Sequence, residues 1–344
     1  MPPARRLRRN WKRAERGQER ETGLDIAEFF TKRFEHDGPS KMSQLNAPHF
    51  QDPDKARQYL EALRWPSGPV CPHCGTVGDH YHLDGKAHRP GLWKCKDCRE
   101  QFTVTVGTVF ERSKIKLNVW LQAVYLICTS KKGISAHQLH RTLGVTYKTA
   151  WFMAHRIREA MQDGSGPLGG NGGPVEVDET YWGNKKPTGY FGKKGRGGHH
   201  QMKVVSLVER GGRARSVQFP AAPITGGTIR EYLKKHIALK ATVHTDESGY
   251  YKPLKNIFAK HETVNHRRGE YSRDGVTTNS VEGYFSILKR GLVGTFHHVG
   301  EQHLQRYVTE FDFRYNTRTA LGVNDVERTS MALRGIGGKR LMYR

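Results

Sequence analysis

Thr277–Arg290 reads TTNSVEGYFSILKR. Apolar side chains recur in it at i, i+3, i+4 and i+7, the spacing of one buried helical stripe: Val281, Tyr284, Phe285 and Leu288. The polar face carries Glu282 in the first turn, with Asn279 one turn before it and Lys289 two turns beyond. A lone acid on such a helix is usually a solvated side chain. Its spacing to other acids favours a different interpretation.

Two further acids lie in strand-like runs. The run PVEVDETYW alternates apolar and polar residues up to Asp178, and the β-rich run ATVHTDE leads to Asp246. Thirty-five residues separate Asp246 from Glu282, and Lys289 follows seven residues later. Three carboxylates on separate elements suit phosphoryl transfer with two divalent metal ions. Their hard oxygen atoms predict Mg²⁺, with Mn²⁺ as an alternative.

The charge of the chain indicates a polyanionic partner. The 344 residues carry a formal net charge of +24 and a pI of about 9.9, which favours nucleic acid. The most apolar run, Val119–Cys128, is too short to span a membrane, and the N-terminus lacks the apolar core of a secretory signal. We therefore expect a cytoplasmic, nucleoid-associated protein without a membrane partner.

Four of the five cysteines form two CxxC pairs, CPHC and CKDC. The pairs supply Cys71 and Cys74, then Cys95 and Cys98. This spacing is typical of a zinc ribbon, in which four thiolates surround one structural Zn²⁺. It also favours a reducing compartment over a disulfide framework.

A helical region follows the ribbon. Helices expected over Ile134–Leu143 and Tyr147–Met161 flank a Gly-Val-Thr turn, a pattern that indicates a helix-turn-helix. Its second helix offers Lys148 and Arg156 as DNA contacts, although many helical hairpins bind nothing. A second candidate is the loop 183–198, which contains six glycines and no acid. Its basic residues suit a phosphate backbone, with a solvated loop as the alternative: Lys185, Lys186, Lys193, Lys194 and Arg196.

Composition and periodicity predict an α+β multidomain protein. Residues 1–41 are expected to form a disordered basic extension, and Met42 is an alternative start. The remaining segments are a helix and zinc ribbon (48–110, with a strand over 101–110), a helical DNA-binding region (111–163), a glycine-rich linker (164–173), a mixed α/β domain (174–320) and a basic C-terminal tail (321–344). In the mixed domain we expect strands at 174–182, 201–209, 213–219, 241–245 and 262–265, helices at 228–236 and 301–318, and a loop at 293–298.

This combination resembles the zinc-ribbon DDE transposases encoded by bacterial insertion sequences, over roughly residues 48–344. The resemblance is carried by RWPSG with CPHCG, WKCKDC with QFTVTVGT, VEVDETYWGN, VHTDES, TNSVEGYFSILKRG and RYNTR. It implies a ribonuclease-H-like catalytic domain, a mixed α/β fold whose first and fourth strands are adjacent. Asp178 would then lie beside Asp246.

The resemblance also implies a reaction. Asp178, Asp246 and Glu282 would hold two Mg²⁺ ions, a metal-activated water would cut DNA at the element's end, and the freed 3′-hydroxyl would attack target DNA. Lys289 would contact phosphate near the scissile bond, and Asn279 is the alternative third ligand. The implied partners are the terminal inverted repeats, target DNA and further copies of the chain on that DNA.

Two other functions are compatible with parts of this pattern. A domesticated, non-catalytic DNA-binding regulator would need only the ribbon and the helix-turn-helix, but all three acids are present here. A nuclease that cuts without joining would use the same site chemistry. Products in which donor and target DNA are linked distinguish joining from cutting.

Overall fold

The computed structural model describes residues 44–78, 80–170, 172–183, 201–219 and 225–341. The expected extension 1–41 and the basic positions Lys185, Lys186, Lys193, Lys194 and Arg196 lie outside the described residues. The chain divides into two compact units. One comprises the described residues up to Leu126, His140–Ala160 and Thr329 onward, and the other comprises Ile127–Leu139 and Met161–Arg328.

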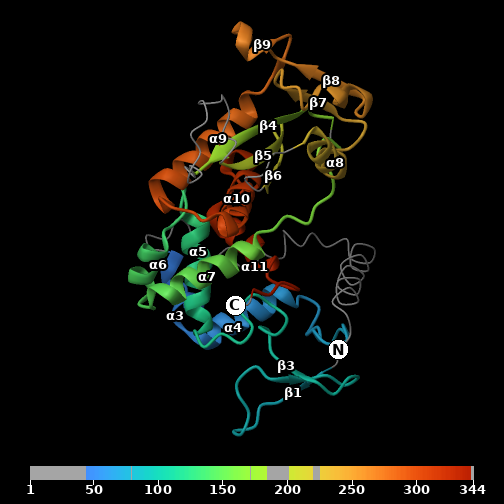
Figure 1. Cartoon of the computed structure of the whole chain (residues 1–344). Helices are drawn as coiled ribbons and strands as arrows, with labels where there is room; N and C mark the ends of the chain where they lie inside the picture. Colours follow the sequence, from blue (N-terminus) through green and yellow to red (C-terminus); the bar gives the residue numbers. More distant parts are fainter. Residues whose placement is uncertain (1–43, 79, 171, 184–200, 220–224, 342–344) are drawn as a thin grey trace. The chain divides into compact units, whose positions relative to one another are not determined.

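The first unit contains short helices and a three-stranded antiparallel sheet of order β1-β2-β3 (Figure 1). Helix α4 begins where Asp52 accepts the N–H groups of Asp54 and Lys55 at 2.8 Å, with Pro53 in its first turn. The elements are η1 (Gln44–Asn46), α3 (Pro48–Gln51), α4 (Pro53–Arg64), β1 (Tyr81–His82), β2 (Trp93–Lys94), β3 (Gln101–Phe102), most of α5 (Leu117–Thr129), the end of α6 (Ala136–Leu143) and α7 (Tyr147–Ala160).

The strand expected over residues 101–110 is mostly absent. Only Gln101–Phe102 pairs with a neighbouring strand. The chain then forms successive turns, in which Thr108 makes a single bridge to Gly337. Val106 N–H donates to Thr103 O at 3.0 Å, and Thr108 N–H donates to Thr105 O at 3.2 Å. Threonine side chains also bond locally here, which competes with a strand ladder.

The predicted C-terminal tail is wrong, because this segment is folded. Helix α11 spans Asp325–Arg334, and Leu333 is buried within the first unit. Beyond the helix, Gly337 pairs with Thr108, and Ile336 O accepts the Val109 N–H at 3.1 Å. Because the end of the chain is rich in basic residues, its few buried apolar residues could not be recognised from composition.

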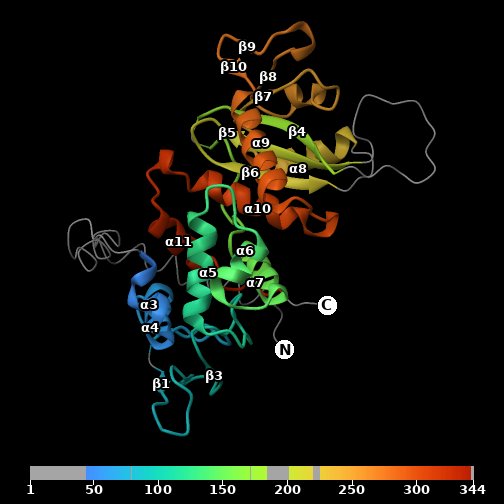
Figure 2. The same ribbon diagram turned by 90° about the vertical axis from the view of Figure 1, so that its left-hand side faces the viewer.

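The second unit is built on a five-stranded sheet of order β6-β5-β4-β7-β8 (Figures 1 and 2). Strands β4, β5 and β6 pair antiparallel, whereas β7 pairs parallel with β4 and β8. The strand bounds are β4 (Val175–Trp182), β5 (Met202–Glu209), β6 (Ala214–Phe219), β7 (Thr242–Thr245) and β8 (Lys260–Thr263). Each begins or ends within two residues of its expected position, since the period-two pattern is strong.

Helices cover both faces of this sheet. The helical elements are α8 (Gly226–His236), η2 (Lys252–Asn256), η3 (His266–Arg268), α9 (Asn279–Gly291), η4 (Leu292–Phe296), α10 (Glu301–Asn316) and η5 (Thr319–Leu321). A small hairpin of β9 (Ser272–Arg273) and β10 (Val276–Thr277) precedes α9. The segment expected as a loop over 293–298 instead begins as the π-helical turn η4, which continues α9.

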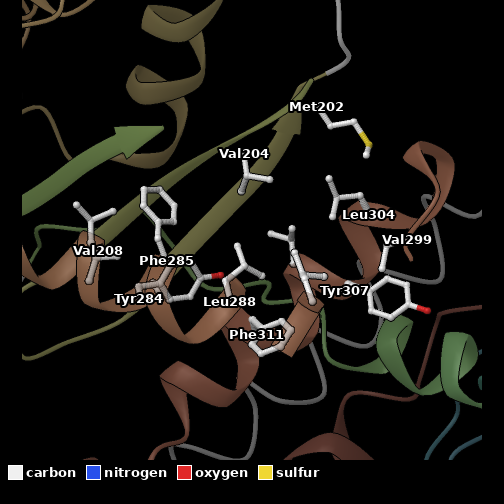
Figure 3. Close-up of a cluster of buried hydrophobic side chains, with 14 residues drawn as sticks. Met202, Val204, Val208, Tyr284, Phe285, Leu288, Val299, Leu304, Tyr307 and Phe311 are labelled. Carbon is white, nitrogen blue, oxygen red and sulfur yellow. The ribbon is translucent and has the colours of Figure 1, made fainter. Parts of the chain in front are cut away.

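Alternation along β5 divides the apolar residues between two cores. Val204 and Val208 point toward α9 and α10, where they join Tyr284, Phe285 and Phe311 in one cluster (Figure 3). The intervening β5 residues, with two from β4, pack against α8 on the other face: Val205, Leu207, Val175 and Val177. The stripe predicted from the sequence of α9 therefore fills the first of these cores, as expected.

The glycine-rich segment 164–173 is anchored to the second unit. Leu168 is fully buried, its N–H donates to His236 O at 2.8 Å, and its carbonyl accepts the Ala238 N–H at 2.8 Å. A single apolar residue among the glycines thus converts the expected linker into an extension of the unit's core.

Candidate functional site

The four ribbon cysteines bring their thiols together. Cys71 and Cys98 Sγ are 3.6 Å apart, and Cys74 and Cys95 Sγ are 3.5 Å apart. A tetrahedral zinc ion with bonds of about 2.3 Å needs sulfur atoms about 3.8 Å apart. All four sulfur atoms lie within 4.8 Å of one another. The donor set and its spacing therefore fit one structural Zn²⁺.

The acidic site begins with two neighbouring parallel strands. Glu176 of β4 pairs with His244 of β7. Continuing this register by two residues sets Asp178 level with Asp246, which directly follows β7. Residues two apart share a face of a strand, so Glu176 and Asp178 both face the side covered by α9.

Asp178 is held among like charges. Burial, followed by the charge of Glu179, raises the pKa of Asp178 to about 8; the Glu179 N–H, which donates to Oδ1 at 2.7 Å, acts in the opposite direction. The charges of Asp246 and Glu282 raise this pKa further. Of the three acids predicted from the sequence, Asp246 and Glu282 thus lie near enough to Asp178 to affect its pKa. Their site favours positive charge.

Asp246 is partly buried beside the same site. Burial raises its pKa, and the Ser248 N–H donating to Oδ1 at 3.0 Å opposes this rise. Glu247 raises the pKa further, whereas His266 and Arg267 lower it. Positive charge near Asp246 therefore compensates part of the negative charge of the acidic cluster.

Glu282 projects from the first turn of α9 with its side chain 45% exposed. Its Oε1 accepts the Thr278 hydroxyl at 3.0 Å and lies 3.7 Å from His266 Nε2. Asn279, the alternative ligand, is exposed at the start of α9, and Lys289 is exposed in its last turn. Within the described ranges, only the four cysteines meet the 4.8 Å spacing of a compact metal cluster; the three carboxylates are more widely spread.

Three residues at this site were missed by sequence reasoning. Glu176, Arg210 and His266 surround the start of α9 and the acids, but they lie on three different segments. Of the three, only Glu176 could have been found from the sequence, because it lies two residues before Asp178 and therefore on the same face of the strand. Neither Arg210 nor His266 carries a local pattern that identifies it.

The two DNA contacts expected on α7 differ in exposure. Lys148 is exposed in the first turn, next to Tyr147. Arg156 is only 5% exposed; its Nη2 donates to Glu111 O at 2.7 Å, and its guanidinium lies 5.4 Å from the centre of the Trp120 ring. Arg156 is therefore a packing residue here, and the expectation of an exposed DNA contact at this position is corrected.

The described residues contain no helix with the length and apolar character needed to cross a lipid bilayer.

Comparisons with known proteins agree on one family. Residues 170–316 match the ISXO2-like transposase domain, and residues 51–101 match the transposase zinc-ribbon domain. A protein in transposable element ISH50 of Halobacterium salinarum is 31% identical over 276 residues, which cover 76% of this chain and 90% of that relative. With its zinc-ribbon cysteines and its mixed α/β domain, the chain therefore belongs to the ISXO2-like transposase family.

Proposed function

We propose that this transposase is a DDE-type enzyme that binds the ends of its insertion sequence, cuts them and joins them to target DNA. Asp178, Asp246 and Glu282 are the proposed ligands of two Mg²⁺ ions, which Mn²⁺ can replace. The observation that carries the proposal is the pairing of β4 with β7, which sets Asp178 level with Asp246 on the face of the sheet covered by α9, the helix that carries Glu282. The charges of Asp246 and Glu282 accordingly raise the pKa of Asp178. Carboxylates assembled in this way match the demand of divalent cations for hard, anionic oxygen ligands.

The chemistry follows from these donors. Bound divalent ions supply Lewis acidity and an activated oxygen nucleophile. The chain's own residues align the DNA, since phosphoryl transfer depends mainly on positioning and electrostatic stabilisation. Lys289, exposed on the same helix as Glu282, contacts a phosphate beside the scissile bond. The four cysteines hold a structural zinc ion that takes no part in this chemistry.

The fold supports the same proposal. Three antiparallel strands followed by two parallel strands, with helices on both faces, are the arrangement expected of a ribonuclease-H-like domain. For DNA recognition we propose that α6 and α7 act as a helix-turn-helix, with the exposed Tyr147 and Lys148 at the beginning of the second helix. The net charge of +24 favours extended contact with inverted repeats and target DNA, on which copies of the chain assemble.

Glu282 is the proposed third ligand in preference to Asn279. Its carboxylate adds negative charge toward two divalent cations, whereas an amide adds only a dipole. Its charge also raises the pKa of Asp178, so the two groups belong to one electrostatic cluster.

The test compares two variants on zinc-loaded protein. Glu282→Gln should reduce cleavage of a duplex carrying the element's terminal repeats by roughly a thousandfold, the scale of losing several kcal/mol of transition-state stabilisation. Asn279→Ala should reduce it by less than about tenfold, because it removes at most a supporting contact. Binding of the same duplex should stay within twofold in both. If Asn279→Ala did not cleave the duplex and Glu282→Gln did, Asn279 would be the third ligand.

A second reaction separates joining from cutting. Wild-type protein, Mg²⁺, a pre-cut element end and a supercoiled target should yield donor DNA covalently linked to target DNA. Cutting without any linked product would instead identify a nuclease, and binding without cutting would identify a regulator.

A further inference from the structure

Glu176 is a fully buried carboxylate whose partners lie at the start of α9. Its Oε2 accepts the N–H groups of Ser280 and Val281 at 2.7 and 3.1 Å, and its Oε1 accepts the Ser280 hydroxyl at 3.0 Å. The first N–H groups of a helix have no intrahelical partner. An anion at this end also interacts favourably with the helix dipole. A strand residue more than one hundred positions earlier therefore caps the helix that carries Glu282.

Arg210 holds this carboxylate in place. Its Nη2 and Nε donate to Glu176 Oε1 at 2.9 and 3.1 Å, and its Nη1 donates to Gly275 O at 2.9 Å. A buried charge needs both a counter-charge and saturated hydrogen bonds. Glu176 has both, and Arg210 additionally ties it to the hairpin that leads into α9.

Because Glu176 caps α9, the side chain of Thr278 is free to make a different contact. Thr278 occupies the N-cap position of α9, yet its side chain makes no capping hydrogen bond. Its hydroxyl donates instead to Glu282 Oε1 at 3.0 Å and lies 3.1 Å from His266 Nε2. Threonine at an N-cap normally satisfies the helix N–H groups. Because Glu176 satisfies two of them here, Thr278 can hold the Glu282 carboxylate.

We propose that Glu176 is a positioning residue for the metal site: it fixes the beginning of α9 against β4, so that Thr278 directs Glu282 toward Asp178 and Asp246. The inference rests on the DDE-type function proposed above. One strand thereby supplies a ligand, Asp178, and the anchor of the helix that supplies another.

A purely structural role for Glu176 would affect stability alone, whereas a positioning role also affects metal affinity. The test uses zinc-loaded Glu176→Gln, which keeps the shape of the side chain but turns an NH₂ group toward donors. Glu209→Gln is the matched control. Glu209 is also buried on the neighbouring strand, but it accepts the Gly169 N–H at 3.2 Å, in a segment whose Leu168 packs in the core on the α8 side of the sheet rather than the α9 side.

Three measurements are made on each protein: the thermal unfolding midpoint, the calorimetric affinity for Mn²⁺ added alone, and the cleavage rate against Mn²⁺ concentration. We expect Glu176→Gln to raise the Mn²⁺ dissociation constant at least tenfold and to recover much of its cleavage at high Mn²⁺. Glu282→Gln, lacking a ligand, should not recover. Glu209→Gln should keep the wild-type affinity whatever its unfolding midpoint.

Wild-type affinity in Glu176→Gln, or an equal loss of affinity in Glu209→Gln, would overturn the positioning role. If Glu176→Gln does not fold, Glu176→Asp takes its place, because it keeps the charge beside Arg210 but is one methylene too short to reach both N–H groups. Its Mn²⁺ affinity should fall at least threefold, and an unchanged affinity again overturns the proposal. Failure of wild-type protein to bind Mn²⁺ or cleave would count against the proposed function itself.

Discussion

Replacing Gly291 with alanine should loosen the helix that carries the acidic site. Gly291 is the last residue of α9 and is buried. A Cβ atom there would lie 2.1 Å from Phe311 Cζ, 2.8 Å from Phe311 Cε1 and 3.1 Å from Lys132 O. Carbon atoms in contact normally lie about 3.5–4.0 Å apart. Phe311 is only 1% exposed, so its ring cannot swing away, and α9 must move relative to α10.

Two opposing contributions set the magnitude. Alanine in place of glycine inside a helix favours folding by about 1 kcal/mol. Overpacking a core costs about 1–3 kcal/mol, and an overlap of more than an ångström belongs at or beyond the upper end. We expect a net loss of about 2 kcal/mol, which corresponds to a fall of roughly 4–8 °C in the unfolding midpoint of a unit this size.

The same helix offers a matched control. A Cβ atom at Gly283 meets nothing within 4 Å, so Gly283→Ala should gain about 0.5–1 kcal/mol from helix propensity alone. Thermal unfolding of zinc-loaded wild type and both variants measures the difference. Gly291→Ala unfolding at or above the wild-type midpoint would refute the packing argument, as would an equal fall in Gly283→Ala.

Two further predictions concern zinc and pH. The double substitution Cys74→Ala, Cys98→Ala should reduce bound zinc from one ion per chain to nearly none and unfold the ribbon, because metal binding drives its folding; full zinc retention in elemental analysis would contradict the assignment. Burial raises the pKa of Asp312 to about 6 from 3.8, although hydrogen bonds from Tyr284 and Ser216 oppose the rise, so the folded state favours the proton. The resulting stability, about 3 kcal/mol, is complete below about pH 4 and is lost as pH rises through 6, with about 1 kcal/mol lost between pH 5 and 8. Asp312→Asn should therefore gain that amount relative to wild type between pH 5 and 8 in urea unfolding, and an unchanged difference would exclude this titration.

Local patterns were sufficient for much of the second unit. The strands containing Asp178 and Asp246 and the helix containing Glu282 were predicted close to their observed bounds, because alternation and helical periodicity are visible within a few residues. The cysteine spacing likewise predicted four neighbouring thiols. These features depend on residues that are near one another in the sequence.

Features that depend on distant partners were not predictable. Leu168 became buried through its pairing beside Ile237, and Ile336 through contacts with the turns near Val109. Neither is part of a periodic run. Arg156 has the residue type of a DNA contact, but its burial depends on the neighbouring Trp120. The polar or glycine-rich segments around Leu168 and Ile336, and the charge of Arg156, suggest exposed positions. Only tertiary packing shows that these three residues are buried.

The two acids on the α9 side of β4 differ in how their charge is compensated. Glu176 is paired with Arg210 and caps α9, so its oxygen atoms are already engaged. Asp178 accepts the Glu179 N–H, and among the described residues no lysine or arginine forms an ion pair with it. A buried carboxylate left in this state is unfavourable unless it is protonated or meets a cation. The same strand face therefore contains one acid whose charge is compensated by Arg210 and one whose charge is not compensated by a basic side chain in the described part of the chain. This difference favours Asp178 over Glu176 as the proposed metal ligand.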